Sequence, residues 1–113
     1  MTQSKYKNKK AVVDNVTFHS IAESERYLIL KMLSRAGKIS GLRLQPKFMI
    51  LDDFMDFEGK KHRKTYYIAD FKYMENGKAI VEDVKGYKKM PVYQLKKKMF
   101  LKANPNIVFR EIL

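Results

Sequence analysis

The dipeptide Asn76-Gly77 lies between two runs of residues that favour β-strands. RKTYYIADFKYM precedes it and KAIVEDVKG follows it, and both runs contain many β-branched and aromatic residues. Asn-Gly closes tight hairpins, because both residues tolerate the positive φ angles that such a turn requires. The second run is therefore predicted to pair antiparallel with the first, and the fold of this chain has to contain that hairpin.

A capping box predicts where the first helix begins. Ser20 is followed three residues later by Glu23, the spacing at which the two residues satisfy backbone N–H groups at a helix start. Gly37 is a stop signal, so the helix is predicted to run to about Ala36. Its apolar residues recur at helical spacing and are expected to pack on a sheet; they are Ile21, Leu28, Ile29, Met32, Leu33 and Ala36.

The remaining segments indicate further strands and one more helix. Residues 42–57 have a strand-like pattern and lead into a hairpin whose turn lies near Gly59. A second helix follows Pro91 and ends at Asn104-Pro105, and residues 107–112 form a last short strand. The order helix, three strands, helix, strand predicts one α/β domain over residues 1–113 with a central mixed sheet and a basic N-terminal arm at about residues 1–12.

Charge and cysteine content restrict the function. The 113 residues include 24 Lys and Arg against 12 Asp and Glu, and the formal charge of +12 favours a polyanion such as nucleic acid. The absence of cysteine excludes a disulfide framework, a thiolate zinc site and a cysteine nucleophile. The sequence contains neither a signal-peptide pattern nor an apolar run of roughly 20 residues, so a cytoplasmic protein without a membrane partner is expected. Charge alone also allows a ribosomal-type or merely soluble basic protein.

Two aspartates and a lysine are predicted to meet on one face of the hairpin. Because side chains alternate along a strand, Asp83 and Lys85 project to one face, while Glu82 and Val84 project to the other. The hairpin also brings Asp70 beside Asp83. Two carboxylates at a sheet end with a nearby ammonium suit Mg²⁺ or Mn²⁺ and phosphodiester hydrolysis. The alternative is an ordinary solvated strand with a cross-strand ion pair.

The order of these segments resembles a known enzyme superfamily. FHSIAESERY, LQPKF, YYIADF, VEDVKG and the following lysine-rich helix are similar to the PD-(D/E)XK nucleases, and more closely to a small phage-encoded branch of unknown function that is similar to Holliday junction resolvases. The resemblance covers the chain from about residue 4 to its end. It implies a restriction-endonuclease-like core, a metal-dependent endonuclease and, for a phage protein, the host cytoplasm.

The resemblance also implies the parts of the catalytic site. Asp70 corresponds to the first acid, although Ala69 occupies the position where many members have proline. Asp83 corresponds to the second acid and Lys85 to the catalytic lysine.

Four further residues match the family pattern. Glu23 corresponds to an acid on the first helix that helps to hold the metal, and the main-chain carbonyl of Val84 to an additional ligand. Gln45 matches a glutamine that is frequent in the branch, although it can equally be an ordinary strand-end residue. Gly86 would allow DNA or backbone to approach closely.

Some of these residues have a second explanation. Glu23 is fully accounted for as part of a capping box, and Glu25, within the apolar stripe of the helix, is the alternative acid. Lys96 lies among apolar residues on its helix and is expected either to extend toward the metal site or to place its ammonium at the edge of the sheet. His19 and His62 have no partner at a spacing useful for zinc.

The basic residues expected to bind phosphates are Arg63, Lys64, Lys88, Lys89, Lys97 and Lys98. The aromatic residues Tyr66, Tyr67, Phe71 and Tyr73 are expected in the sheet core rather than in base stacking. The predicted function is a Mg²⁺-dependent endonuclease for branched or structured DNA, and a homodimer is expected because a branched substrate has two strands to cut. The alternatives are a non-catalytic nucleic-acid-binding protein and a small adaptor for phage replication proteins.

Overall fold

The computed structural model describes residues 9–84 and 90–112. Two helices and ten strands occupy these ranges. In chain order they are β1 (Ala11–Val13), β2 (Val16–Phe18), α1 (Ile21–Arg35), β3 (Ser40–Leu44), β4 (Lys47–Leu51), β5 (Phe54–Met55), β6 (Lys61–His62), β7 (Thr65–Ile68), β8 (Phe71–Glu75), β9 (Lys78–Val84), α2 (Pro91–Ala103) and β10 (Ile107–Ile112).

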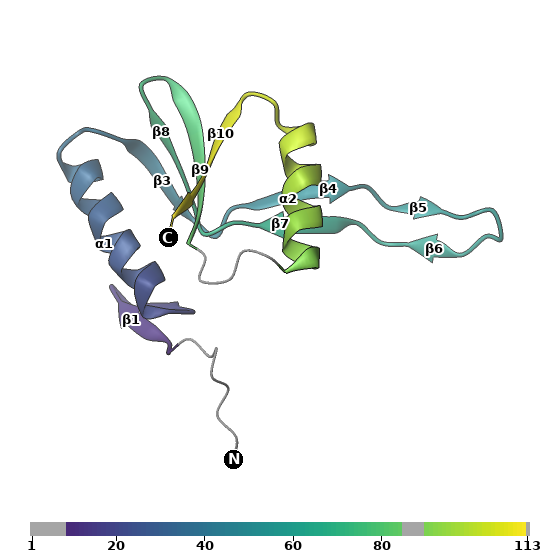
Figure 1. Ribbon diagram of the computed structural model, residues 1–113, viewed down its shortest axis with the longest axis horizontal. Helices are drawn as coiled ribbons and strands as arrows, with labels where there is room; N and C mark the ends of the chain where they lie inside the picture. Colours follow the sequence, from purple (N-terminus) through teal and green to yellow (C-terminus); the bar gives the residue numbers. More distant parts are fainter. Residues whose placement is uncertain (1–8, 85–89, 113) are drawn as a thin grey trace, which may run out of the picture.

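A four-stranded mixed sheet forms the centre of the molecule (Figure 1). Its strands lie in the order β10-β9-β8-β3; β8 is antiparallel to both of its neighbours, and β10 runs parallel to β9. The predicted α/β class and mixed sheet are confirmed. The helices and the sheet strands follow one another along the chain as α1, β3, β8, β9, α2 and β10, so the expected order is present, with a long insertion between β3 and β8.

The predicted Asn-Gly hairpin joins β8 to β9. Asn76 and Gly77 have φ angles of 52° and 77°, the left-handed values that a tight turn between twisted strands requires. Glu75 pairs with Lys78, and the register continues without a shift to Phe71 opposite Glu82. This turn therefore fixes which residues of the two strands face each other.

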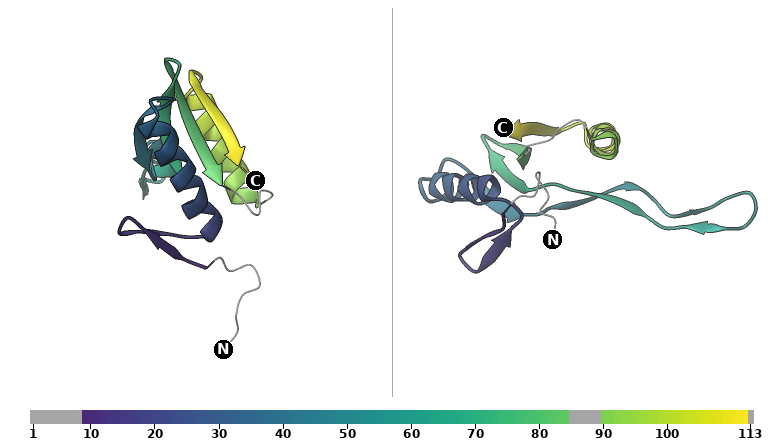
Figure 2. Two further views of the ribbon diagram at one scale, coloured as in Figure 1. Left: turned by 90° about the vertical axis from the view of Figure 1, so that its left-hand side faces the viewer. Right: turned by 60° about the horizontal axis from the view of Figure 1, so that its bottom comes forward.

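Helix α1 begins and ends where the sequence predicts. The Ser20 hydroxyl accepts a hydrogen bond from the N–H of Glu23 at 3.0 Å, and Gly37 follows the helix with a φ angle of +76°. The helix covers the sheet face opposite to the one on which α2 lies (Figure 2).

The predicted packing face of α1 is wrong. Tyr27 and Leu30 are buried in the core with Ile80, whereas the side chains of Ile21, Leu28, Ile29 and Met32 are 43–63% exposed. The buried face is selected by specific contacts: Tyr27 packs against Phe18 at 5.1 Å between ring centroids and donates a hydrogen bond to Asp14. Of the predicted face, Leu33 packs against the core.

Helix α2 encloses an aromatic cluster on the second face of the sheet. Phe100 is fully buried and contacts Phe48, with 4.7 Å between the ring centroids, and Tyr67, with 5.2 Å. Val81 of β9 and Phe109 of β10 complete this layer. Within the described ranges, neither helix is long and apolar enough to cross a membrane.

The insertion between β3 and β8 forms an arm that projects from the body of the molecule (Figure 1). Strand β4 pairs with β7 at its base, and β5 pairs with β6 nearer the tip. The arm leaves the sheet at Gln45, whose φ angle is +51°, and at the following Pro46, and its tip turn contains Gly59 as predicted. The sequence indicated the hairpin but not its departure from the sheet.

A second hairpin, β1–β2, was not predicted. Its turn residues, Asp14 and Asn15, have φ angles of 54° and 63°. The Asp14 carboxylate accepts hydrogen bonds from Tyr27 and Lys31 of α1, so this hairpin is tied to the helix.

Candidate active site

Asp70 and Asp83 lie opposite each other where β8 begins and β9 ends. The backbone N–H of Asp70 donates to Oδ1 of Asp83 at 3.0 Å, and the N–H of Val84 donates to Oδ2 of Asp70 at 2.7 Å. Each carboxylate is thus oriented by a backbone donor of the other strand. The predicted convergence of the two aspartates is confirmed.

The two acidic neighbours on β9 face opposite sides of the sheet, as predicted. Asp83 is 1% exposed and accepts a hydrogen bond from the hydroxyl of Tyr67, a member of the cluster under α2. Glu82 is 0% exposed and pairs with Arg26 of α1. Asp83 is therefore the carboxylate that shares a face with Asp70.

A third carboxylate, which was not predicted from the sequence, lies beside Asp70 and Asp83. We call these three residues, Asp70, Asp83 and Glu111, the carboxylate row. Glu111 of β10 is the register partner of Asp83 on the adjacent parallel strand. Lys97 donates to its Oε2 at 3.1 Å, and the hydroxyl of Tyr93 donates to the same atom. A signal was available, because Glu111 has the same strand parity as Ile107 and Phe109, so it is a carboxylate on an otherwise apolar face.

Tyr93 links these carboxylates electrostatically. Burial raises the pKa of its hydroxyl well above the ordinary value, and the hydrogen bond to Glu111 and the charges of Asp83 and Asp70 raise it further. The tyrosine therefore remains a neutral hydrogen-bond donor at physiological pH. All three carboxylates, Asp70, Asp83 and Glu111, therefore raise the pKa of the same hydroxyl group.

The aspartate pair fits a hard divalent cation that needs few protein ligands. Mg²⁺ is typically bound through one or two carboxylates, with waters and substrate phosphate oxygens completing its octahedron. The described residues contain no group of three or more His, Cys, Asp or Glu side chains arranged to hold a metal. The carboxylate oxygens of Asp70 and Asp83 are of the chemical type that Mg²⁺ and Mn²⁺ prefer as ligands.

The other predicted catalytic residues have separate positions. Lys85, Gly86, Lys88 and Lys89 lie outside the described residues. Glu23 is buried at the start of α1, where its Oε1 accepts the backbone N–H of His19 at 3.0 Å. Its capping role is confirmed, and the structure does not group it with the aspartates.

Glu25 is exposed on α1, so its position within the helix carries no burial cost. Gln45 contributes through its backbone: its N–H donates to the carbonyl of Asp70 at 2.9 Å, and its side chain is exposed. His19 is mainly exposed, and His62 bonds Asp56 at 2.9 Å in the arm.

Lys96, a predicted catalytic-site residue, and the predicted phosphate-binding residues Arg63, Lys64 and Lys98 lie in different places. Lys96 is half-buried in a hollow of about 300 Å³ that Tyr67 and Tyr93 also line. Arg63 and Lys64 line a second, more open hollow of about 510 Å³ on the arm. Lys98 is exposed on α2.

Lys97 differs from this prediction, because its ammonium is engaged by other side chains of the protein. It pairs with Glu111 and lies over the rings of Tyr93 and Phe109, at 5.6 and 5.8 Å from their centroids. Its side chain is 22% exposed, and the pair with Glu111 places its charge beside the carboxylates. Tyr67, Phe71 and Tyr73 are buried as expected, whereas Tyr66 is half-buried on the arm.

A comparison with protein-family models places this arrangement in a defined group. The model described as "Protein of unknown function (DUF1064)" matches residues 3–112. The chain belongs to this family. The family description carries no activity, and a search of curated proteins finds no match to the chain.

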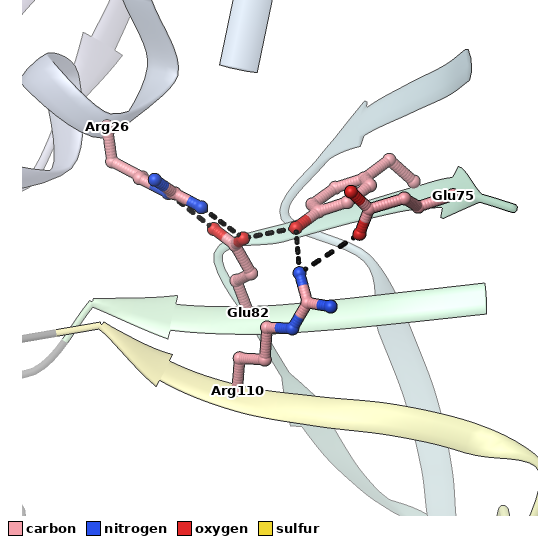
Figure 3. Close-up of polar contacts among 5 residues, drawn as sticks. Arg26, Glu75, Glu82 and Arg110 are labelled. Carbon is pink, nitrogen blue, oxygen red and sulfur yellow. Dashed lines mark hydrogen bonds and ion pairs between the residues drawn. The ribbon is translucent and has the colours of Figure 1, made fainter. Parts of the chain in front are cut away.

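Behind the candidate site, an ionic network centred on the buried Glu82 fixes β9 from the opposite face (Figure 3). The Nε and Nη2 atoms of Arg26 donate to the two carboxylate oxygens of Glu82 at 2.8 and 2.6 Å. This bidentate geometry is the strongest form of a carboxylate–guanidinium pair, and the hydrogen bond raises the pKa of Arg26. The pair connects α1 to the strand that carries Asp83.

Tyr73 and Arg110 extend the network to the neighbouring strands. The hydroxyl of Tyr73 donates to Glu82, and Arg110 donates to the Tyr73 oxygen and to Glu75, both at 3.2 Å. Burial raises the pKa of Tyr73 to about 12, with the Glu82 hydrogen bond contributing in the same direction. The tyrosine therefore stays a neutral donor, and β8, β9 and β10 are locked to α1 next to the aspartate pair.

Proposed function

We propose that this protein is a Mg²⁺-dependent endonuclease that hydrolyses phosphodiester bonds in branched or otherwise structured DNA. The observation that carries the proposal is the opposed pair of Asp70 and Asp83, oriented by backbone hydrogen bonds at one end of a sheet. The formal charge of +12 and the basic hollow on the arm support a polyanionic substrate.

The chain's own residues have distinct roles in this proposal. Asp70 and Asp83 hold the cation, which supplies charge neutralisation and a more acidic water when bound. The N–H of Asp70 and the hydroxyl of Tyr67 orient Asp83, and the N–H of Val84 orients Asp70. In sequence, Lys85 directly follows Val84, and we assign it to the negative charge that develops on the phosphate.

The proposal includes three further expectations, which concern the fold, the oligomeric state and the cellular location. The order α1, β3, β8, β9, α2, β10 is compatible with a restriction-endonuclease-like core. A branched substrate presents two strands for cleavage, which favours a homodimer. The same substrate implies action in the cytoplasm where the DNA is, the host cytoplasm for a phage protein.

A cleavage assay tests the proposed activity. Four-way junction, flap, duplex and single-stranded DNA are incubated with the protein and Mg²⁺ or Mn²⁺, and parallel reactions contain excess chelator. We expect cleavage of at least one branched or flapped substrate with the metal and none with the chelator, because the aspartates alone cannot neutralise a phosphate.

Two outcomes of this assay would contradict the proposed activity. A protein that binds these substrates but cuts none of them is the non-catalytic binding module. A protein that neither binds nor cuts them is not a nucleic-acid enzyme at all.

A further inference from the structure

The arm contains a feature that the aspartate pair does not explain, namely two hollows that share one residue. Tyr66 of β7 lines the basic hollow with Lys61, Arg63 and Lys64, and it also lines the hollow that contains Lys96. The second hollow reaches Tyr67 and Tyr93, whose hydroxyl groups bond Asp83 and Glu111. The two hollows therefore adjoin at Tyr66, and the second one is lined by the two tyrosines that bond Asp83 and Glu111.

The positive and negative charges of the arm lie on different segments. Lys60, Lys61, Arg63 and Lys64 lie on the segment that returns from the tip, while Asp52, Asp53, Asp56 and Glu58 lie on the outgoing segment and in the turn. Asp53 also lines the basic hollow, but three cations line it as well. Asp56 is used internally, since it accepts hydrogen bonds from two backbone N–H groups of the turn and bonds His62. The returning edge is thus the one that suits phosphates.

Aromatic rings accompany these cations. Tyr66 is half-buried, and the ammonium of Lys47 lies 4.2 Å from its ring centroid, so its ring is beside a fifth positive charge. Phe57 at the tip is fully exposed but lies between Asp56 and Glu58, so Tyr66 is the ring that stands among the cations. Cations interleaved with accessible rings are the pattern by which proteins bind single strands, because the rings stack on bases and the cations hold the backbone.

Distance favours a strand of several nucleotides. Arg63 and Asp70 are seven residues apart along extended chain, which corresponds to about 23 Å. An extended single strand can follow a path of this length while its phosphates contact successive cations.

We infer that a single-stranded segment of nucleic acid lies along β7, with its phosphates on Lys61, Arg63 and Lys64 and one base on the ring of Tyr66. The inference rests on the proposed function, because it takes the strand that reaches the carboxylate row as the substrate. It narrows the substrate class to nucleic acid with an unpaired segment beside the bond to be cut, as in a flap or an opened branch.

Binding of a fluorescent single-stranded oligonucleotide of about 12 nucleotides tests this inference. Anisotropy is measured in chelator, so that no cleavage occurs. The double variant Arg63→Ala/Lys64→Ala is compared with Lys38→Ala/Lys78→Ala, which removes the same charge from exposed positions at the far end of the sheet. We expect the arm variant to lower the slope of log affinity against log salt by about 1.4, because each lost contact to a single strand contributes about 0.7, and the control to leave it unchanged.

The ring is tested separately. Tyr66→Leu should weaken binding about 10-fold, and Tyr66→Phe should bind like the wild type, because stacking needs the ring but not the hydroxyl. Urea unfolding of each variant verifies that the fold is retained. Equal salt slopes for the two double variants, unchanged binding by Tyr66→Leu, or equally strong competition by a polyglutamate peptide would each overturn the inference.

The outcomes also separate this inference from the proposed function. A wild-type protein that binds the strand through the arm but cleaves no substrate refutes the nuclease and leaves the arm site in place. A protein that cleaves DNA while its arm variants bind normally refutes the arm site alone.

Discussion

Asp83→Asn is expected to abolish Mg²⁺-dependent DNA cleavage while the protein stays folded. Asparagine has the size of aspartate and keeps an oxygen that can accept the N–H of Asp70, so the backbone geometry at the sheet end is preserved. It removes the negative charge that we propose to bind the cation. We expect the cleavage rate to fall at least about 100-fold, because losing a metal ligand exceeds the usual effect of losing a residue that only orients one.

Glu75→Gln is the matched control for this variant. It removes one carboxylate from the same hairpin, but Glu75 pairs with Arg110 near the opposite end of the strands. It should cleave like the wild type. Equal loss of cleavage in both variants would show that the effect is one of general charge or stability, and unchanged cleavage by Asp83→Asn would remove Asp83 from the mechanism.

Arg26→Ala is expected to cause the largest loss of stability. It leaves the carboxylate of Glu82 at 0% exposure without its guanidinium partner. Breaking a buried ion pair by removing one member typically costs about 3–5 kcal/mol, since the remaining charge has neither water nor a counter-ion. The free energy of unfolding in urea measures this, with Arg43→Ala as a control at an exposed position on β3.

The double variant Arg26→Met/Glu82→Leu separates the charge effect from packing. Replacing both members of a buried pair with apolar residues is often neutral, so much of the lost stability should return. If the double variant is no more stable than Arg26→Ala, the network contributes through shape rather than through charge compensation. If Arg26→Ala unfolds like the control, the pair is not a significant source of stability.

The Asp70–Asp83 pair could be predicted because a tight turn sets the register of a hairpin. Asn76-Gly77 allows only a short connection, and each residue on β8 then has one partner on β9. Alternation of side chains separates Asp83 from Glu82 in the same way. Both inferences need only local geometry, which a sequence pattern carries.

Glu111 could not be placed beside Asp83 by the same reasoning. Strand β10 is parallel to β9 and follows it through α2, so no turn specifies which residues pair. The register instead depends on how α2 packs over Phe48, Tyr67 and Phe109, which are distant in sequence.

The packing face of α1 was predicted wrongly for a related reason. Helical periodicity selects the most apolar stripe, but the native face combines Tyr27 with the charged Arg26. The partner of Arg26 lies on β9, and the partner of Tyr27 lies in the β1–β2 turn. An ion pair formed across 56 positions of sequence leaves no trace in a local pattern. The departure of the arm from the sheet was not predicted, in part because the sequence pattern of residues 42–57 is that of one continuous strand. The left-handed conformation of Gln45 changes the direction of the chain within this segment.

The most direct test of the account is whether Asp70 and Asp83 bind a divalent cation. Mn²⁺ binding is followed by electron paramagnetic resonance for wild type, Asp83→Asn and Glu75→Gln, each with the preferred DNA made uncleavable by phosphorothioate linkages. We expect the wild type and Glu75→Gln to bind Mn²⁺ equally, and Asp83→Asn to bind it at least about 10-fold more weakly. Equal binding by all three proteins, or no binding beyond that of the DNA alone, would contradict the account.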